Sequence, residues 1–269
     1  MLRVKLSVVY AMGLISVAMG LSGCSTAVVD KTVGMSPNAI YADAKDSIDN
    51  GQYDKAIPLF EKLEARAAGT PLAQQAQLDK AYAQYRSGEP AQAIATLERF
   101  MKLHPASPAL DYALYLKGTI NFNDDLGMFS AISRQDLSER DQKASKEAFE
   151  SFKELVTRFP DSRYTPDASQ RMNYIVSSLA QYEVHVARYY YSRGAYLAAI
   201  NRAQSAIADY RDVPALEEAL FIIYKSYDAL NMAQLRDDAK RVLESSYPQS
   251  EFLTKGVKAK GTDPWWKVW

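Results

Sequence analysis

The side chains that most often carry catalysis are scarce in this chain of 269 residues. It contains one cysteine, Cys24, and two histidines, His104 and His185, which lie far apart in the sequence. A catalytic nucleophile needs a positioned base, and a metal site needs several ligands at suitable spacing. The sequence offers neither, because acidic pairs such as Asp124-Asp125 and Glu217-Glu218 are adjacent and point in different directions on a helix. We therefore expect no enzyme activity, no metal and no other cofactor.

The charge balance narrows the class of partner. Lysine plus arginine equals aspartate plus glutamate, at 32 each, so no overall field attracts nucleic acid. Arg3 and Lys5 precede an apolar run from Leu6 to Met19, whose length suits a secretory signal rather than a membrane span. Removal of residues 1–23 takes these two cations and no acid, which leaves a mildly acidic chain.

The surroundings of Cys24 do predict a chemical modification. Cys24 follows Leu21-Ser22-Gly23 directly after the apolar run, an order that resembles the bacterial lipoprotein signal, in which the cysteine is acylated and becomes the new N-terminus. Two or more acyl chains are enough for stable membrane anchoring. Ser25, in place of the aspartate that resembles an inner-membrane retention signal, favours the outer membrane. The alternative is an incidental cysteine beside an ordinary signal peptide.

Residues 25–35 show no helical periodicity, and residues 24–36 are predicted to be a tether. The eleven residues from Ser25 to Met35, at roughly 3.3–3.6 Å each, would hold the first helix up to about 40 Å from the bilayer surface.

From residue 37 to residue 248 the chain is punctuated as a series of helix pairs. A small or hydroxyl residue before proline favours a helix start, and such starts occur at Ser36-Pro37, Thr70-Pro71, Ser107-Pro108 and Thr165-Pro166, with a weaker version at Val213-Pro214. Helix stops at Asn50-Gly51, Gly88, Gly194 and Asn231 are each followed by a new run of apolar residues at helical spacing. These signals predict an all-α solenoid of five helix pairs.

The expected helices are at about 37–49 and 53–67, 71–86 and 90–103, 108 onward and 142–159, 166 onward and after Gly194, and 214–230 and 233–246. Small residues beside aromatic ones, a turn glycine and an exit proline resemble the tetratricopeptide repeat, and the interval from Gly51 to Gly88 is near its usual period of about 34 residues. Pro58 is the proline that falls inside an expected helix, where it predicts a kink or a late helix start.

Three segments depart from the repeat. Residues 121–140 interrupt the third pair, either as an insertion packed on its own repeat or as a partner-binding loop. The first helix of the fourth pair is predicted to extend by about 16 Å beyond its counterpart in the second pair, and this extension carries Tyr189 and Tyr190. The tail contains Trp265, Trp266 and Trp269, which could contact a partner, fold back on the last repeat or touch the bilayer.

A lipoprotein signal, five tetratricopeptide-like pairs and an interrupted third repeat occur here together with the strings SPNAIYADAKDSIDNGQYDKAI, LDYALYLKG and VARYYYSRGAYLAAINR. This combination closely resembles the BamD (ComL) family of outer membrane assembly lipoproteins, over about residues 10–248. The expected organisation is a signal peptide at 1–23, a lipid-anchored tether at 24–36, a repeat array at 37–248 and a tail at 249–269. Within the array, 37–107 would form the first two repeats, 108–162 the interrupted third, and 163–248 the last two.

The resemblance implies a non-enzymatic scaffold on the periplasmic face of the outer membrane, within the machinery that inserts β-barrel proteins. In that family the N-terminal repeats are thought to receive unfolded barrel substrates. The C-terminal repeats contact the barrel subunit and its companion lipoproteins. The family arginine of the string RGAYxAAxNR falls on Arg202, which becomes a candidate contact.

Two groups of candidate binding residues follow. An extended, aromatic-ended substrate peptide could lie near Tyr41, Tyr53, Tyr82 and Tyr85. Partner contacts are expected at Arg202, Tyr189 and Tyr190 and in the tail at Trp265, Trp266 and Trp269, although the resemblance does not extend to the tail. A lipid-anchored periplasmic adaptor for cell-wall or division factors remains the alternative function.

Overall fold

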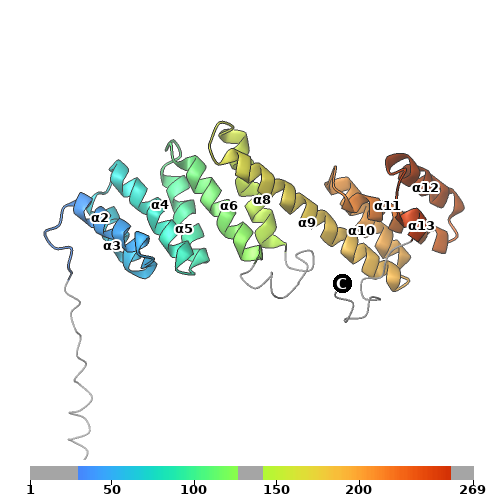
Figure 1. The fold of residues 1–269 in the computed structure, drawn as a ribbon, viewed down its shortest axis with the longest axis horizontal. Helices are drawn as coiled ribbons and strands as arrows, with labels where there is room; N and C mark the ends of the chain where they lie inside the picture. The colour runs from blue at the N-terminus through green and yellow to red at the C-terminus, as the bar shows by residue number, and fades with distance from the viewer. Residues whose placement is uncertain (1–29, 127–141, 256–269) are drawn as a thin grey trace, which may run out of the picture.

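The computed structural model describes residues 30–126 and 142–255 of the chain, and within them it has ten helices in five antiparallel pairs followed by a short final helix (Figure 1). Cys24, residues 127–141 and the three tryptophans lie outside the described residues. The pairs are α2 (Pro37–Asp49) with α3 (Tyr53–Arg66), α4 (Pro71–Arg86) with α5 (Pro90–Leu103), α6 (Leu110–Leu126) with α8 (Lys143–Arg158), α9 (Thr165–Ser192) with α10 (Tyr196–Asp209), and α11 (Ala215–Ala229) with α12 (Ala233–Ser246). The predicted all-α solenoid of five tetratricopeptide-like pairs is confirmed.

The turns inside four of the pairs share one backbone conformation. Gly51, Gly88 and Gly194 have φ values of 69°, 87° and 76°, and Asn231 occupies the equivalent place with φ 58°. In each turn the following residue donates its N–H to a carbonyl five residues earlier, as Gln52 does to Ser47 at 2.8 Å. This pattern ends a helix and requires a left-handed residue, which explains the glycines and the asparagine. These turns lie along one edge of the array, the lower edge in Figure 1. The turns between pairs lie along the opposite edge, which we call the linking edge.

The helix starts follow the predicted punctuation in part. Ser36 and Thr70 cap α2 and α4. The side-chain oxygen of each accepts a hydrogen bond of 3.2 Å from the backbone N–H of the residue three positions later. The expectation that Thr165 caps the fourth pair is wrong, because Thr165 is the first residue of α9 and its hydroxyl donates to the carbonyl of Phe159 at 2.8 Å. In the third pair α6 begins at Leu110, two residues after Pro108.

Pro58 lies inside α3 without delaying its start. The helix runs from Tyr53 to Arg66, so the expected late start at Pro58 is wrong. A proline in the second turn removes a single backbone hydrogen bond, while Phe60 and Leu63 remain fully buried on the same helix. Burial of these two side chains outweighs the loss of one backbone hydrogen bond at Pro58.

The core is built from aromatic residues of the second helices placed against small residues of the first helices. Phe60, Phe100 and Phe152 are fully buried on α3, α5 and α8. Gly118 on α6 permits the closest approach, because a Cβ at that position would lie 2.5 Å from Cε1 of Phe152.

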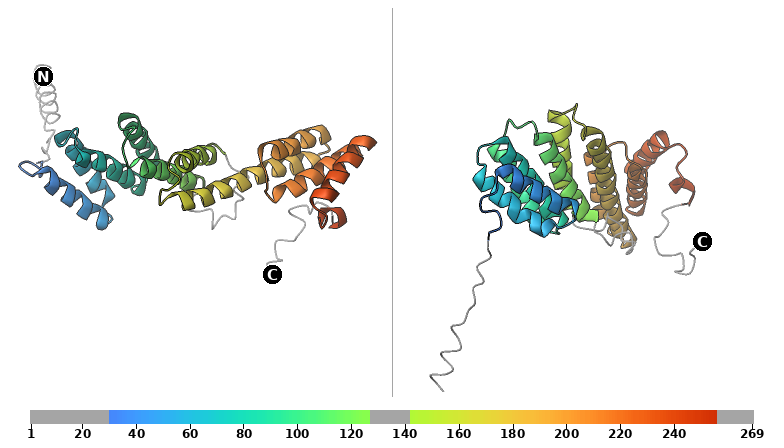
Figure 2. Two further views of the ribbon diagram at one scale, coloured as in Figure 1. Left: turned by 90° about the horizontal axis from the view of Figure 1, so that it is seen from above. Right: turned by 60° about the vertical axis from the view of Figure 1, so that its left-hand side comes forward.

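Helix α9 joins the two halves of the array. Its 28 residues span about 42 Å, which agrees with the predicted extension of the fourth pair. Ile175 and Leu179 pack in a buried cluster with α6 and α8, whereas Val184 and Ala187 pack with α10 and α11. The left view of Figure 2 shows α9 running between the two groups of helices. The extension is therefore covered by a neighbouring repeat.

Two segments outside the regular pairs bear on the expectations for the third pair and the tail. Residues 121–126 belong to α6 and continue its helix, so the interruption of the third pair starts later than predicted. The tail begins with α13 (Phe252–Lys255), and the ring of Phe252 lies 5.7 Å from that of Phe221 on α11. This part of the tail packs back on the last repeat.

The C-terminal part of the expected tether is folded onto α3, where four residues form what we call the N-terminal clamp: Asp30, Thr32, Lys62 and Arg66. Lys62 Nζ donates to Asp30 Oδ1 at 2.6 Å, and Arg66 donates to the Thr32 carbonyl at 2.6 Å and to Thr32 Oγ1 at 3.0 Å. Thr32 is 1% exposed. Hydrophobic periodicity could not predict these contacts, because Lys62 and Arg66 lie 32 to 34 residues away from Asp30 and Thr32.

Candidate functional site

The first helices of successive pairs carry a run of tyrosines that we call the aromatic stripe: Tyr41 on α2, Tyr82 on α4, Tyr112 and Tyr115 on α6, and Tyr164 next to α9. The ring of Tyr164 stacks on Tyr115 with a centroid distance of 4.6 Å and lies 5.7 Å from Tyr112. All five are half-buried, so each keeps part of its ring on the surface. The stripe crosses four helices that are far apart in sequence.

Two aspartates, one buried and one half-buried, orient two members of the stripe. Tyr41 donates its hydroxyl to Asp79 Oδ2 at 2.9 Å, and Tyr115 donates to Asp167 Oδ2 at 2.8 Å. Each aspartate has a further donor, Gln75 Nε2 for Asp79 and Arg171 Nε for Asp167. Hydrogen bonds to a charged acceptor are stronger than neutral ones, so the ring positions are well defined.

Burial and the neighbouring carboxylate disfavour ionisation of two of these phenols. Burial, together with the hydrogen bond to Asp79, raises the pKa of Tyr41 to about 12. Burial also raises the pKa of Tyr112, with smaller contributions from the charge of Asp79 and from neighbouring tyrosines. The carboxylates of Asp79 and Asp167 beside the stripe already have hydrogen-bond donors.

The four tyrosines predicted to form a substrate groove do not play equal parts. Tyr53 contacts Tyr82 edge-to-face at 6.3 Å, and the guanidinium of Arg86 lies 5.0 Å from the ring of Tyr53 and 5.7 Å from that of Tyr82. Tyr41 joins the stripe through Asp79. Tyr85 packs against the buried cluster between α4, α5 and α6. Tyr41 and Tyr82 thus belong to the stripe and Tyr53 lies beside it, while Tyr85 packs against the core.

Sequence reasoning missed Tyr112, Tyr115 and Tyr164. One signal was available, because Tyr112 follows Pro108 at the same interval as Tyr41 follows Pro37, and equal positions in a repeat face the same side. Tyr164 precedes its helix, and nothing local indicates that it stacks on Tyr115.

The candidate partner residues of the C-terminal half lie on α9 and α10. Tyr189 is 53% exposed, contacts Tyr190 edge-to-face at 5.9 Å and has the Arg193 guanidinium 5.4 Å from its ring. Leu197 nearby in sequence is 64% exposed. Arg202 NH1 lies 3.2 Å from Glu183 Oε2, with about half of the arginine side chain in solvent. An exposed apolar surface and a reachable guanidinium thus occur on the same helix pair.

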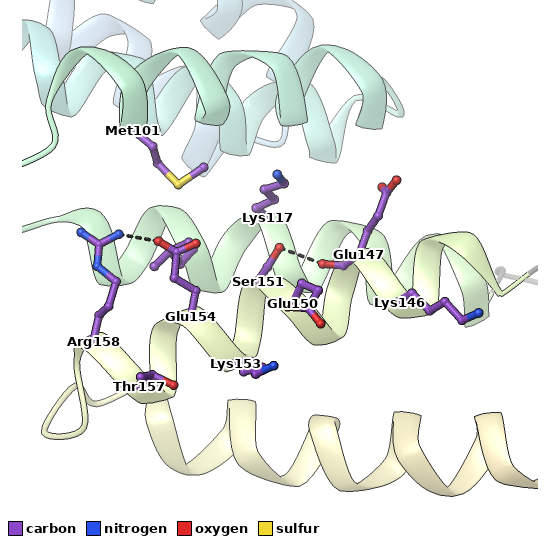
Figure 3. Close-up of a pocket in the computed structure, with 11 residues that line it drawn as sticks. Met101, Lys117, Lys146, Glu147, Glu150, Ser151, Lys153, Glu154, Thr157 and Arg158 are labelled. Carbon is purple, nitrogen blue, oxygen red and sulfur yellow. Dashed lines mark hydrogen bonds and ion pairs between the residues drawn. The ribbon is translucent and has the colours of Figure 1, made fainter. Parts of the chain in front are cut away.

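A concavity lies between α5 and α8, over α6 (Figure 3). It has a volume of about 510 Å³, and Met101 and Leu114 are among its apolar lining residues. The other lining residues include four cations and three glutamates, among them Arg158 paired with Glu154. Because charges of both signs are interleaved, this groove lacks the single-sign field that attracts a small ion.

His104 caps the C-terminal end of α5, and its ring lies 5.1 Å from that of Phe100. Among the described residues no cluster of three or more histidines, cysteines or acids could hold a metal ion. None of the described helices is both long and apolar enough to cross a membrane.

Five stacked helix pairs, with an aromatic stripe in which aspartates position two of the tyrosines, define a helical-repeat protein of the tetratricopeptide type. Residues 34–243 match the model of the YfiO family, described as an outer membrane lipoprotein, and the chain belongs to this family.

Named relatives agree with this assignment. The chain is 44% identical over 260 residues to the outer membrane protein assembly factor BamD of Neisseria meningitidis. The aligned residues cover 95% of this chain and 97% of the relative. It is 43% identical over 260 residues to the BamD protein of Neisseria gonorrhoeae, with the same two shares, and 32% identical over 232 residues to that of Vibrio cholerae, covering 86% and 95%. Among solved structures, a putative kinesin light chain of Podosopora anserina with tetratricopeptide-like repeats covers 80% of this chain at 17% identity and a TM-score of 0.34.

Proposed function

We propose that this chain is a non-enzymatic lipoprotein scaffold that acts in the assembly of outer membrane β-barrel proteins, on the periplasmic face of the outer membrane. Family membership and the printed names of the relatives support the assembly role. The aromatic stripe is the observation that carries the substrate-binding part of the proposal.

An unfolded β-barrel chain exposes apolar and aromatic side chains at alternate positions. The stripe offers half-buried rings, and Asp79 and Asp167 accept hydrogen bonds from the hydroxyls of two of them, Tyr41 and Tyr115. A bound peptide aromatic can pack edge-to-face or offset-stacked against such rings, which contributes beyond the burial of area alone. Because the rings are already fixed, little conformational entropy is lost on binding.

Crosslinking tests this binding surface. A peptide from the C-terminal end of a β-barrel protein, with an aromatic last residue and a photoreactive group, should crosslink to the full chain. Tyr112→Ala and Tyr164→Ala should reduce the crosslinking several-fold. Tyr224→Ala is the matched control, because this half-buried tyrosine lies on α11, away from the stripe. Unchanged crosslinking in both stripe variants would refute the substrate site.

We further propose that the surface formed by Tyr189, Tyr190, Leu197 and Arg202 binds the barrel subunit of the machinery and its companion lipoproteins. Exposed aromatic and arginine side chains are the residues that most often dominate protein interfaces. Arg202→Glu would repel Glu183, its present partner, as well as an acidic partner group. Trp265, Trp266 and Trp269 stay predictions for the same class of contact.

Pull-down from detergent-solubilised outer membranes separates the two surfaces. Tyr189→Ala with Arg202→Glu should lose the barrel subunit and retain peptide crosslinking, whereas the stripe variants should behave in the opposite way. Loss of both activities in every variant would indicate unfolding rather than two sites.

Acylation of Cys24 is proposed as the anchor to the outer membrane. The Cys24→Ser protein should leave the membrane fraction after a high-salt wash. Retention in that fraction would show that the lipid is not the anchor.

A further inference from the structure

The N-terminal clamp shortens the free part of the tether. Six peptide steps separate Cys24 from Asp30, so these residues can lie at most about 20 Å apart. Without the clamp, the free chain would extend to Ser36, the cap of α2, and the limit would be about 40 Å. The clamp therefore halves the distance at which the first helix pair can sit from a lipid on Cys24.

The clamp lies at the same edge of the array as the start of α2, because α2 and α3 are antiparallel. Arg66 is the last residue of α3, and Lys62 lies one turn earlier. The tether consequently enters at the linking edge, where the first pair connects to the second. The turn at Asn50 and Gly51 lies at the other end of α3, about 21 Å away for a helix of 14 residues.

Charge is distributed unequally between these two ends. Lys31 and Lys102 are exposed near the linking edge, and neither is in an ion pair with another residue that the structure describes. Lys62 and Arg66 add two cations there, which pair with the carboxylate of Asp30, and Glu61 is an exposed acid at the same end. The opposite end of the first pair carries the exposed acids Asp46, Asp49 and Asp54 together with the exposed Lys55.

We propose that the linking edge of the first two helix pairs lies on the anionic phospholipid surface of the membrane, held by the N-terminal clamp and by Lys31 and Lys102. The proposal rests on the acylation of Cys24 put forward above. Each lysine or arginine near an anionic surface strengthens association roughly fivefold. The attraction decays within a Debye length of about 10 Å, so the acids at the far end contribute little repulsion.

This orientation has a consequence for the aromatic stripe. The stripe lies on the first helices, between the linking edge and the opposite edge, so it would be held within about one helix length of the bilayer. A substrate peptide bound there would remain close to the membrane into which it inserts.

Two single-cysteine labels measure the orientation. Acylation blocks the thiol of Cys24, the only native cysteine, so an introduced cysteine is labelled alone. Ala68→Cys lies just beyond α3 at the linking edge, and Gln52→Cys lies just before α3 at the other end; both positions are exposed. The mature lipidated chain is reconstituted in vesicles of phosphatidylethanolamine with a minority of phosphatidylglycerol that carry a short-range headgroup quencher. We expect stronger quenching of the label at position 68 than at position 52.

Two variants separate the clamp from the charge. Asp30→Ala removes the acceptor of the clamp and also makes the linking edge more basic. If the clamp holds this edge at the membrane, quenching at position 68 should fall. If attraction between the lysines and the anionic lipid alone holds it there, quenching should rise. Lys31→Glu with Lys102→Glu keeps the clamp and should reduce quenching only in vesicles that contain phosphatidylglycerol. Lys55→Glu, at the opposite end of α3, is the matched control and should change neither signal.

The outcomes distinguish this inference from the function on which it rests. Equal quenching of the two labels on membrane-bound protein would overturn the orientation and leave the scaffold function intact. Increased quenching in Asp30→Ala would overturn the role of the clamp. Absence of the wild-type chain from the vesicles would instead contradict the lipid anchor itself.

Discussion

Replacement of Gly118 by alanine should loosen the packing of α6 on α8. An added Cβ would lie 2.5, 2.7 and 2.9 Å from Cε1, Cδ1 and Cζ of Phe152, whereas ordinary contacts of a Cβ are 3.4–4 Å. Phe152 is fully buried, so its ring would have to move by about 1 Å within a close-packed core. The same ring contacts Tyr115 at 6.3 Å and Phe122 at 6.4 Å between centroids, so the displacement would reach the aromatic stripe.

Two opposing effects set the size of the change in stability. Overpacking of a core costs about 1–3 kcal/mol, while alanine is favoured over glycine inside a helix by up to about 1 kcal/mol. The net loss for Gly118→Ala should be about 1 kcal/mol, which lowers Tm by about 2–4 °C in a chain of this length. Urea unfolding of the full chain, followed by circular dichroism, measures the difference.

The matched test places the same substitution in a Phe152→Leu background. Leucine is smaller, so the alanine at position 118 would no longer meet a ring, and its helix preference should dominate. Gly118→Ala should then stabilise the chain, which reverses the sign seen with Phe152 present. If Gly118→Ala stabilises both backgrounds equally, Phe152 does not pack against Gly118 and the reasoning is wrong.

Three further substitutions test other parts of the structure. Gly88→Asn should lower the free energy of unfolding by no more than about 0.5 kcal/mol, because Asn231 adopts the same left-handed conformation in the fifth pair. Gly88→Val should lower it by at least about 1 kcal/mol. Equal losses of stability in thermal unfolding would argue against a conformational cause. The hydrogen bonds from Lys62 and Thr32 hold the pKa of Asp30 well below its usual value, so its contribution to stability is present above about pH 4 and lost as pH falls further. Asp30→Asn should therefore be less stable than wild type at neutral pH, and a gap that persists unchanged at pH 2 would contradict this. Glu218→Gln should destabilise by about 1–2 kcal/mol, since Arg188 NH2 donates to Glu218 Oε2 at 2.7 Å between α9 and α11, and an unchanged urea midpoint would show that the pair contributes nothing.

The helix pairs could be predicted from the sequence because their signals are local. A proline at a helix start, a residue with positive φ at its end and an apolar spacing between them act within a few residues of one another. Gly51, Gly88 and Asn231 thus mark the turns in the order in which the structure has them. The length of α9 followed in the same way from the distance between Pro166 and Gly194.

Tertiary structure alone decided which residues meet across the array. Tyr41 and Asp79 are 38 residues apart, and Tyr115 and Asp167 are 52 apart, so no local pattern links them. The same holds for the clamp on Asp30 and for the contact of Gly118 with Phe152, which depend on the stacking of whole helices. The sequence by itself determined the repeat, because turn geometry and helical period are properties of short segments. Only the packing of the pairs decided the surfaces, because side chains from different repeats converge once the helices are in place.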